Sequence, residues 1–180
     1  ASGIHPRHSE YSIRTVRADK KDPLTLFMTD AGFPVEDENK KPESTAVFSF
    51  PIKAPKGAIT RHDMTAIEHL EIWKIYAEYW CEHKPSITVS VKEDEWLKVG
   101  AFVYENFDAM SGVSFLPMSE HIYEQAPYQD CTKKEYEELL KRMPTSIDWK
   151  ALSEHEREDN TISSQTFNCV GDFCEVVDLV

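Results

Sequence analysis

The stretch SITVSVKEDEWLKVGAFVYENFDAMSGVSFLP, residues Ser86 to Pro117, decides the fold class of the chain. It starts with alternating apolar residues, typical of a β-strand, and it ends with the apolar run GVSFLP. Between them, three acidic residues favour a helix N-terminus, and apolar residues recur at helical spacing at Trp96, Val99, Val103 and Phe107. A strand, a helix and a strand within 32 residues have the length of a crossover between parallel strands. We therefore predict an α/β fold.

The remainder of the chain predicts further strands and helices around this unit. The charged stretch 36–43 is expected to be a surface loop, because it contains no apolar residue. The other predicted elements, in chain order, are a strand over Ser12–Ala18, a short helix that starts at Asp22 and Pro23 and ends at Gly32, a strand within Ser44–Pro55, a long helix capped by Thr60 with Asp63 and ended by Pro85, and a helix with a capping box of Thr132 and Glu135.

The strands are few, and the two best defined are expected to be parallel and buried. Parallel sheets occur mainly where both faces are covered, so this set is expected to belong to a larger barrel or sheet. Residues 1–150 are predicted to form the folded part. Residues 151–180 are predicted to form a flexible tail, because they contain seven acidic residues against the single Arg157 and the polar stretch EHEREDNTISSQ.

The composition limits the classes of function. The 180 residues suffice for one domain, and a hydrophobic content of 41% suffices for a packed core. A formal net charge of −12 argues against binding to nucleic acid or to an anionic membrane. No apolar run approaches the roughly 20 residues of a membrane span, and the N-terminus does not resemble a signal peptide. We expect a soluble, cytoplasmic protein.

The chain contains four cysteines, Cys81, Cys131, Cys169 and Cys174. They are too few for a secreted disulfide scaffold, which indicates a reducing compartment, and the first two are expected to be structural. The sequence also begins without Met and enters a turn at once, so we expect a fragment or a processed product.

Cys169 and Cys174 form a Cys-x4-Cys pair near the C-terminus, with Gly171 between them. Gly171 eases closure of a small disulfide ring, and exchange with another disulfide explains the pair better than stability does. The extended chain from Asn160 to Cys169 reaches roughly 30 Å at ~3.3 Å per residue, far enough to move between two reaction partners. Two alternatives stay open: incidental cysteines on a disordered end, and a zinc site, for which the ligands are too few.

Histidines and basic residues offer weaker signals. No His-Glu-x-x-His or facial-triad spacing occurs, so a metal role is not favoured, and we assign no metal site. Arg14 and Arg17, with Lys20 and Lys21 close behind, form a basic cluster that either binds a phosphate or lies on a solvated edge. The chain has no GxGxxG, no P-loop and no G-x-S-x-G motif.

Taken together, these residues resemble the C-terminal part of an adenosylcobalamin-dependent, class II ribonucleotide reductase. The resemblance covers nearly all of the chain. It rests on SGIHPRHSEYSIRTVRADKKDPL (Ser2–Leu24), VFSFPIKAP (Val47–Pro55), WCEHKPSITVSVKEDEW (Trp80–Trp96), ENFDAMSGVSFLP (Glu105–Pro117) and YEQAPYQDC (Tyr123–Cys131), followed by the terminal Cys-x4-Cys.

The resemblance implies the C-terminal portion of a ten-stranded α/β barrel, with parallel strands, covering helices and a flexible tail. It implies reduction of ribonucleotides, with triphosphates favoured, to deoxyribonucleotides for DNA synthesis, with adenosylcobalamin as the cofactor of the full enzyme. Cys169 and Cys174 would pass electrons from thioredoxin or glutaredoxin to an active-site disulfide. The residues that contact cobalamin are not assigned.

The departures from the family pattern concern completeness. The finger-loop motif Asn-x-Cys-x-Glu and the barrel cysteine pair are absent and would lie upstream. The chain alone is therefore expected to be incomplete and inactive, with the missing N-terminal part or a complementing chain as its partner. The rival interpretation is a non-catalytic, acidic interaction or assembly module with incidental cysteines.

Overall fold

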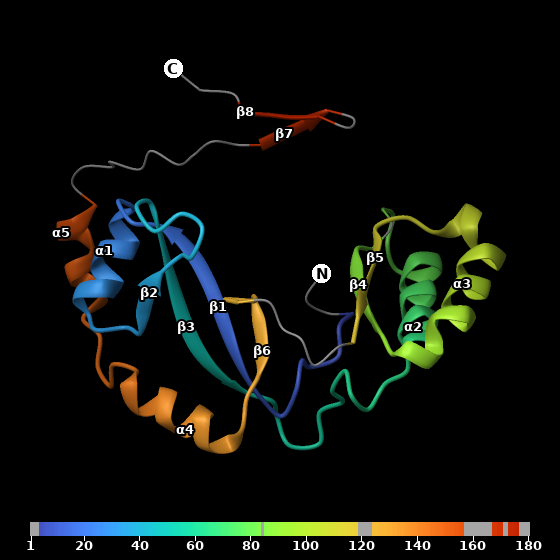
Figure 1. Cartoon of the computed structure of the whole chain (residues 1–180), viewed down its shortest axis with the longest axis horizontal. Helices are drawn as coiled ribbons and strands as arrows, with labels where there is room; N and C mark the ends of the chain where they lie inside the picture. Colours follow the sequence, from blue (N-terminus) through green and yellow to red (C-terminus); the bar gives the residue numbers. More distant parts are fainter. Residues whose placement is uncertain (1–3, 84, 119–123, 157–166, 171–172, 177–180) are drawn as a thin grey trace. The chain divides into compact units, whose positions relative to one another are not determined.

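The computed structural model describes residues 4–83, 85–118, 124–156, 167–170 and 173–176, the last two ranges by their backbone only. The chain divides into two compact units (Figure 1). The first unit consists of Ala1–Ser12 and Lys53–Tyr123, and the second of Ile13–Ile52 and Glu124–Val180. Together they give a mixed α/β protein, as the sequence predicts.

The first unit contains the parallel crossover predicted from the sequence. Strand β4 pairs with β5 in parallel, with Ile87 opposite Val113, and α2 and α3 lie on the same side of this pair (Figure 1). The strand–helix–strand prediction is thus confirmed. The elements of the unit are α2 (Ala66–Tyr79), β4 (Ile87–Val91), the 3-10 turn η1 (Glu93–Glu95), α3 (Trp96–Glu105), the 3-10 turn η2 (Phe107–Ala109) and β5 (Val113–Pro117).

The core of the first unit forms where α2 packs on β4. Trp73 and Leu70 of α2 are fully buried, as is Val89 of β4. The indole Nε1 of Trp73 donates a hydrogen bond to the backbone oxygen of Pro85, 2.7 Å away, so this large side chain leaves no buried donor unpaired. The prediction of two buried strands holds for β4 but is wrong for β5, in which no residue is fully buried and Leu116 is 48% exposed.

The start of α2 differs from the prediction. Thr65, not Thr60, caps the helix, and its side chain accepts from the backbone N–H of Glu68 while the Glu68 carboxylate accepts from Thr65. Thr60 and Asp63 bond to each other at 2.7 Å, but they close a turn before the helix. Both pairs have the Thr-x-x-acid spacing of a capping box, so spacing alone does not distinguish them.

A buried carboxylate joins the beginnings of two helical segments in the first unit. Glu95 is 7% exposed, and its two oxygens accept from the backbone N–H of Ala66 at 3.1 Å and of Lys92 at 2.9 Å. Backbone N–H groups in the first helical turn have no partner within the helix. Glu95 therefore provides an acceptor for a buried N–H at the start of α2 and for a partly buried N–H at the start of η1.

The second unit is built on a four-stranded sheet of order β2-β3-β1-β6. β2 and β3 are antiparallel. β1 and β3 also run in opposite directions, because Lys20 bonds Ser44 at one end of the pair and Ala54 bonds Glu10 at the other. The elements are β1 (Tyr11–Asp19), α1 (Pro23–Asp30), β2 (Val35–Asp37), β3 (Thr45–Lys53), β6 (Tyr128–Asp130), α4 (Lys133–Arg142), the 3-10 turn η3 (Trp149–Ala151), α5 (Leu152–His155), β7 (Phe167–Val170) and β8 (Phe173–Val176).

Local sequence signals are confirmed at two helices of this unit. The Asp22 carboxylate accepts from Leu24 N–H at 2.8 Å at the start of α1, and Gly32 follows the helix with a φ of +82°, which glycine adopts without strain. Thr132 caps α4 with the predicted capping box. The predicted loop over 36–43 is wrong at its start, because Glu36 and Asp37 belong to strand β2.

The chain remains helical beyond residue 150, where the flexible tail is predicted to start. Trp149 of η3 stacks obliquely on Phe27 of α1, with ring centroids 5.4 Å apart. His155 of α5 bonds the Asp30 carboxylate through Nε2 at 3.0 Å. This bond, together with the carbonyl of Ala151, raises the pKa of His155 above its ordinary value. Residues 157–166, which make up much of the predicted tail, lie outside the described residues.

Packing of α5 on α1 is expected to weaken as the pH rises. Because the folded-state pKa of His155 is raised, its stabilising effect is fully present below about pH 6.5 and is lost as the pH rises through the folded-state pKa. The substitution Asp30→Asn should bring the pKa of His155 down towards its ordinary value. A titration of the His155 ring followed by NMR measures the pKa in both proteins, and an unchanged pKa in the variant would contradict the assignment.

Loss of the Glu95 carboxylate should destabilise the first unit. Glu95→Ala leaves one buried and one partly buried N–H group without this acceptor, and we expect the free energy of unfolding to fall by about 2 kcal/mol. Asp94→Ala is the matched control, because Asp94 is the exposed neighbour of Glu95. Urea unfolding of both variants gives the comparison, and equal stabilities would show that the two bonds do not matter.

Candidate functional site

The two tail cysteines predicted as the redox pair lie opposite each other in a β-hairpin. β7 and β8 pair antiparallel, and the register places Cys169 directly opposite Cys174. Directly opposed residues of an antiparallel pair have Cα atoms about 4.5–5.5 Å apart, within the range that a disulfide spans. Gly171, between the two cysteines, lies outside the described residues. The backbone therefore brings together the two residues that the sequence singles out.

The other two cysteines show no sign of a redox pair. Cys81 and Cys131 are free thiols, each half-buried. Burial raises the pKa of Cys131, and the carboxylates of Glu135 and Asp130 add to the effect. A thiol with a raised pKa has less of the reactive thiolate form, which agrees with the structural role expected for this residue.

The two arginines of the basic cluster, Arg14 and Arg17, lie on β1 and contact the distant segment 125–128. Arg14 lies over the ring of Tyr128, 4.3 Å from its centroid. Arg17 donates to the backbone oxygen of Gln125 at 3.1 Å and approaches the carboxylate of Glu38 at 3.6 Å. Lys20 pairs with Asp37 at 2.6 Å. Of the two interpretations of the cluster, these contacts do not favour phosphate binding.

Gln125 lies shortly before β6, and no sequence pattern predicted a role for it. Its φ is +53°, a left-handed conformation that is uncommon outside glycine. Its side-chain amide donates to the Asp37 backbone oxygen at 2.8 Å and to Glu36 at 2.9 Å, and its oxygen accepts from Asn39 N–H at 3.1 Å. The strained residue is therefore anchored to β2 and the turn that follows it.

Two histidines of the first unit have defined tautomers. Nε2 of His5 accepts from the backbone N–H of Thr88 at 3.0 Å, so this nitrogen has no hydrogen. Nε2 of His69 lies 3.0 Å from the carbonyl of Ile4, which can only accept, so this nitrogen does have the hydrogen. Burial lowers the pKa of His69, which is 4% exposed. Both histidines thus hold the N-terminal segment, and no group of metal ligands occurs among the described residues.

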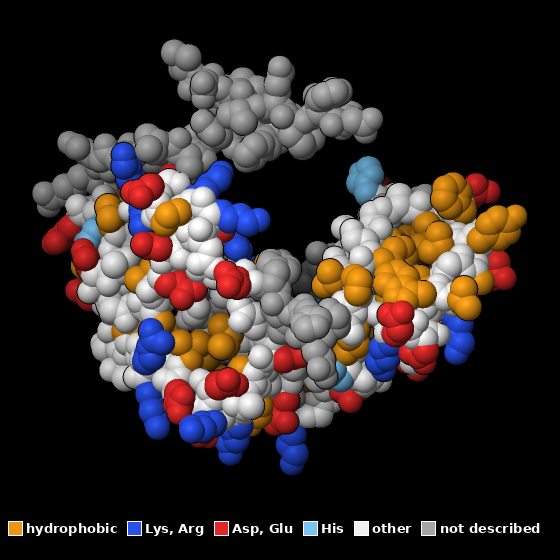
Figure 2. Space-filling model, viewed as in Figure 1, with side chains coloured by type: hydrophobic (Ala, Val, Ile, Leu, Met, Phe, Trp, Pro, Cys, Tyr) orange, Lys and Arg blue, Asp and Glu red, His pale blue; other side chains and the backbone are white. Residues whose placement is uncertain are grey.

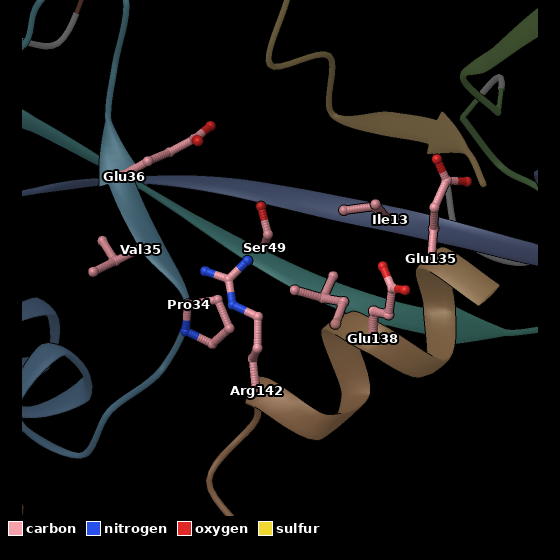
Figure 3. Close-up of a pocket in the computed structure, with 9 residues that line it drawn as sticks. Ile13, Pro34, Val35, Glu36, Ser49, Glu135, Glu138 and Arg142 are labelled. Carbon is pink, nitrogen blue, oxygen red and sulfur yellow. The ribbon is translucent and has the colours of Figure 1, made fainter. Parts of the chain in front are cut away.

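A cleft of about 330 Å³ lies between the β-sheet and α4 of the second unit (Figure 3). Ile13 and Val35 line it, together with three acidic residues, Glu36, Glu135 and Glu138, and with Arg142. Figure 3 shows Arg142 extending towards Ser49 on β3. The excess of carboxylates does not suit the phosphates of a nucleotide. None of the helices in the described part of the chain has the length and apolar content of a membrane span.

Comparisons with known proteins identify the relatives of the chain. No protein-family model matches. The adenosylcobalamin-dependent ribonucleoside-triphosphate reductase of Euglena gracilis is 30% identical over 96% of this chain. The probable adenosylcobalamin-dependent ribonucleoside-triphosphate reductase of Dictyostelium discoideum is 29% identical over 97% of it. The chain is a homologue of part of these reductases. It spans 24% of the length of each, and the resemblance inferred from its motifs is confirmed.

A solved structure agrees with this relationship to the cobalamin-dependent reductases. The crystal structure of a B12-dependent, class II ribonucleotide reductase matches 84% of this chain with a TM-score of 0.64 and 21% sequence identity. The match covers 21% of that chain. The two units of the present chain therefore have the fold of one portion of the class II enzyme.

Gln125 affects stability in two opposite ways, because its side-chain hydrogen bonds stabilise the fold and its left-handed backbone conformation destabilises it. Two substitutions separate these effects. Gln125→Ala removes the side-chain hydrogen bonds and keeps a Cβ in the left-handed conformation, whereas Gln125→Gly removes the bonds but relieves the strain. We expect the alanine variant to be less stable than the glycine variant by about 1 kcal/mol. Chemical denaturation of the two variants measures the difference. Equal stabilities would show that the conformation is not strained.

Proposed function

We propose that the chain is the C-terminal part of an adenosylcobalamin-dependent ribonucleoside-triphosphate reductase. In this proposal Cys169 and Cys174 pass electrons to the active-site disulfide of the enzyme. The main support is that almost the whole chain matches two such reductases, over 24% of the length of each. The hairpin register that opposes Cys169 and Cys174 supports the same conclusion, since a pair at that spacing can alternate between dithiol and disulfide.

The chemistry of the relay balances in thiols and disulfides. One tail thiolate attacks the oxidised active-site disulfide and forms a mixed disulfide. The second tail thiolate then attacks the tail sulfur of that bond, which releases the active-site pair as a dithiol and leaves Cys169 and Cys174 bonded to each other. Two electrons move from tail to active site, and thioredoxin or glutaredoxin restores the tail dithiol by the same exchange.

The parallel pair β4–β5 is proposed as the closing part of the ten-stranded barrel. Ile87 and Val91 use their backbone groups for bonds to the β5 side, so Thr88 faces the opposite edge of β4. His5 covers that edge, because its ring accepts the Thr88 N–H. Among the described residues, β5 pairs with no strand other than β4. Further barrel strands would therefore join beside β5, the more exposed strand of the two.

The relatives depend on adenosylcobalamin, and the cleft of the second unit does not fit that group. The cleft between the sheet and α4 has a volume of about 330 Å³, near the lower end of pockets for drug-sized ligands, whereas a corrin with its nucleotide is much larger. Cobalamin contacts in the proposed enzyme would come from the rest of the reductase. The chain alone is accordingly expected to be inactive, and its partners are that remaining part and the ribonucleotide substrate.

The thiol relay predicts a specific loss of turnover. With the remaining part of the reductase supplied, Cys169→Ser or Cys174→Ser should lower turnover with thioredoxin as reductant at least 100-fold. Dithiothreitol reaches the active-site disulfide without the tail, so turnover with dithiothreitol should be unchanged. The measurement is deoxyribonucleotide formation over many cycles with each reductant.

Cys81→Ser serves as the control for this prediction, because Cys81 is a free, half-buried thiol with no proposed role. Normal turnover with thioredoxin in both tail variants would refute the relay. Failure of thioredoxin to form a mixed disulfide with either tail cysteine would favour the rival function, an acidic assembly module with incidental cysteines.

A further inference from the structure

Helix α3 is apolar on two opposite faces, and only one of them packs against other residues that the structure describes. Val99 and Phe102 are buried against β4 and α2. The outer face has a single stripe of residues at helical spacing, three or four positions apart. They are Leu97, Gly100, Ala101 and Tyr104. Leu97 is 90% exposed and Tyr104 is 86% exposed. A surface helix normally has charged or polar residues at such positions.

Gly100 lies near the middle of this outer stripe, and no contact with the described residues requires a glycine there. A Cβ built on Gly100 meets no atom within 4 Å, so no other segment of the described chain approaches it. Glycine within a helix costs about 1 kcal/mol relative to alanine. Its benefit is that another backbone can approach closely at the two small residues, Gly100 and Ala101, between the larger Leu97 and Tyr104.

Other large apolar side chains of the first unit are exposed as well. Phe107 in η2 is 70% exposed, and Trp80, just after α2, is 81% exposed. Figure 2 shows hydrophobic side chains gathered over α2 and α3. Scattered exposed apolar residues are ordinary, but a group of this kind marks an interaction surface.

Charges around the stripe indicate the kind of partner. Lys98 and Glu105 flank it on α3, and Asp94 and Asp108 lie beyond its two ends, all exposed. Three carboxylates thus stand against one ammonium group, in a chain with a net charge of −12. A second copy of the chain would bring like charges together, whereas a helix with basic residues beside its apolar face complements the surface.

We infer that the outer face of α3 is a docking surface for a helix that belongs to the remaining part of the reductase. The inference rests on the proposed function, since it takes its partner from the relatives, of which this chain spans 24%. The partner helix would cross α3 at Gly100 and Ala101, with its apolar face against Leu97 and Tyr104 and its basic residues near Glu105 and Asp108.

The substitution Gly100→Leu tests this docking surface. It removes a helix glycine, so the isolated chain should become more stable, and it fills the point of closest approach, so docking should weaken at least tenfold. The binding partner is the portion of the Euglena gracilis reductase that lies outside its match to this chain. Isothermal titration calorimetry measures the dissociation constant, and thermal unfolding measures the stability of the chain.

Lys134→Leu is the matched control, because it places the same side chain on α4 at a position that is 85% exposed. Equal dissociation constants for the wild type and Gly100→Leu would overturn the inference alone, whereas no association at all would overturn both the inference and the proposed function. Self-association of the chain that Gly100→Leu abolishes would assign the face to a second copy and would also overturn it. Cys169→Ser should leave this association unchanged, so loss of the thiol relay and loss of docking are separate results.

Discussion

The parallel pairing of β4 with β5 is the constraint on which the first unit depends. Five residue pairs lie in register, from Ile87 opposite Val113 to Val91 opposite Pro117. Parallel neighbours cannot be joined by a tight turn, so the chain must cross over through a helix, and α3 supplies that crossover. The same geometry directs Val89 towards α2 and fixes where Trp73 packs. It also leaves β5 only partly covered, which the proposed place of this pair in a larger barrel explains.

Features set by neighbouring residues could be predicted from the sequence, and features that depend on tertiary contacts could not. Asp22, Gly32 and Thr132 act within one helical turn, so their roles follow from residue type and spacing. Thr60 and Thr65 both precede an acidic residue by three positions, and only the packing of α2 decides which one is the cap. Strand β2 escaped prediction because all its residues are exposed, and pairing with β3 alone makes it a strand.

In the candidate site, too, local features could be predicted from the sequence and long-range contacts could not. The Cys169–Cys174 pair could be found because its spacing is local, although the antiparallel register of the two strands was not predicted. The roles of Arg17 and Gln125 could not be inferred from spacing, since they contact each other across 108 positions of sequence. The basic residues looked like one cluster in the sequence. In the fold Arg14, Arg17 and Lys20 each have a different partner, and these contacts do not favour a phosphate site.

The contact between His5 and Thr88 bears on the tendency of the chain to aggregate. An uncovered strand edge is a template on which strands of other molecules can add, and this is a common route to aggregation. At Thr88 the backbone donor already belongs to the imidazole of His5, and Pro6 follows with no N–H of its own. The opening residues of the chain therefore shield one side of its parallel pair from fibre-like growth.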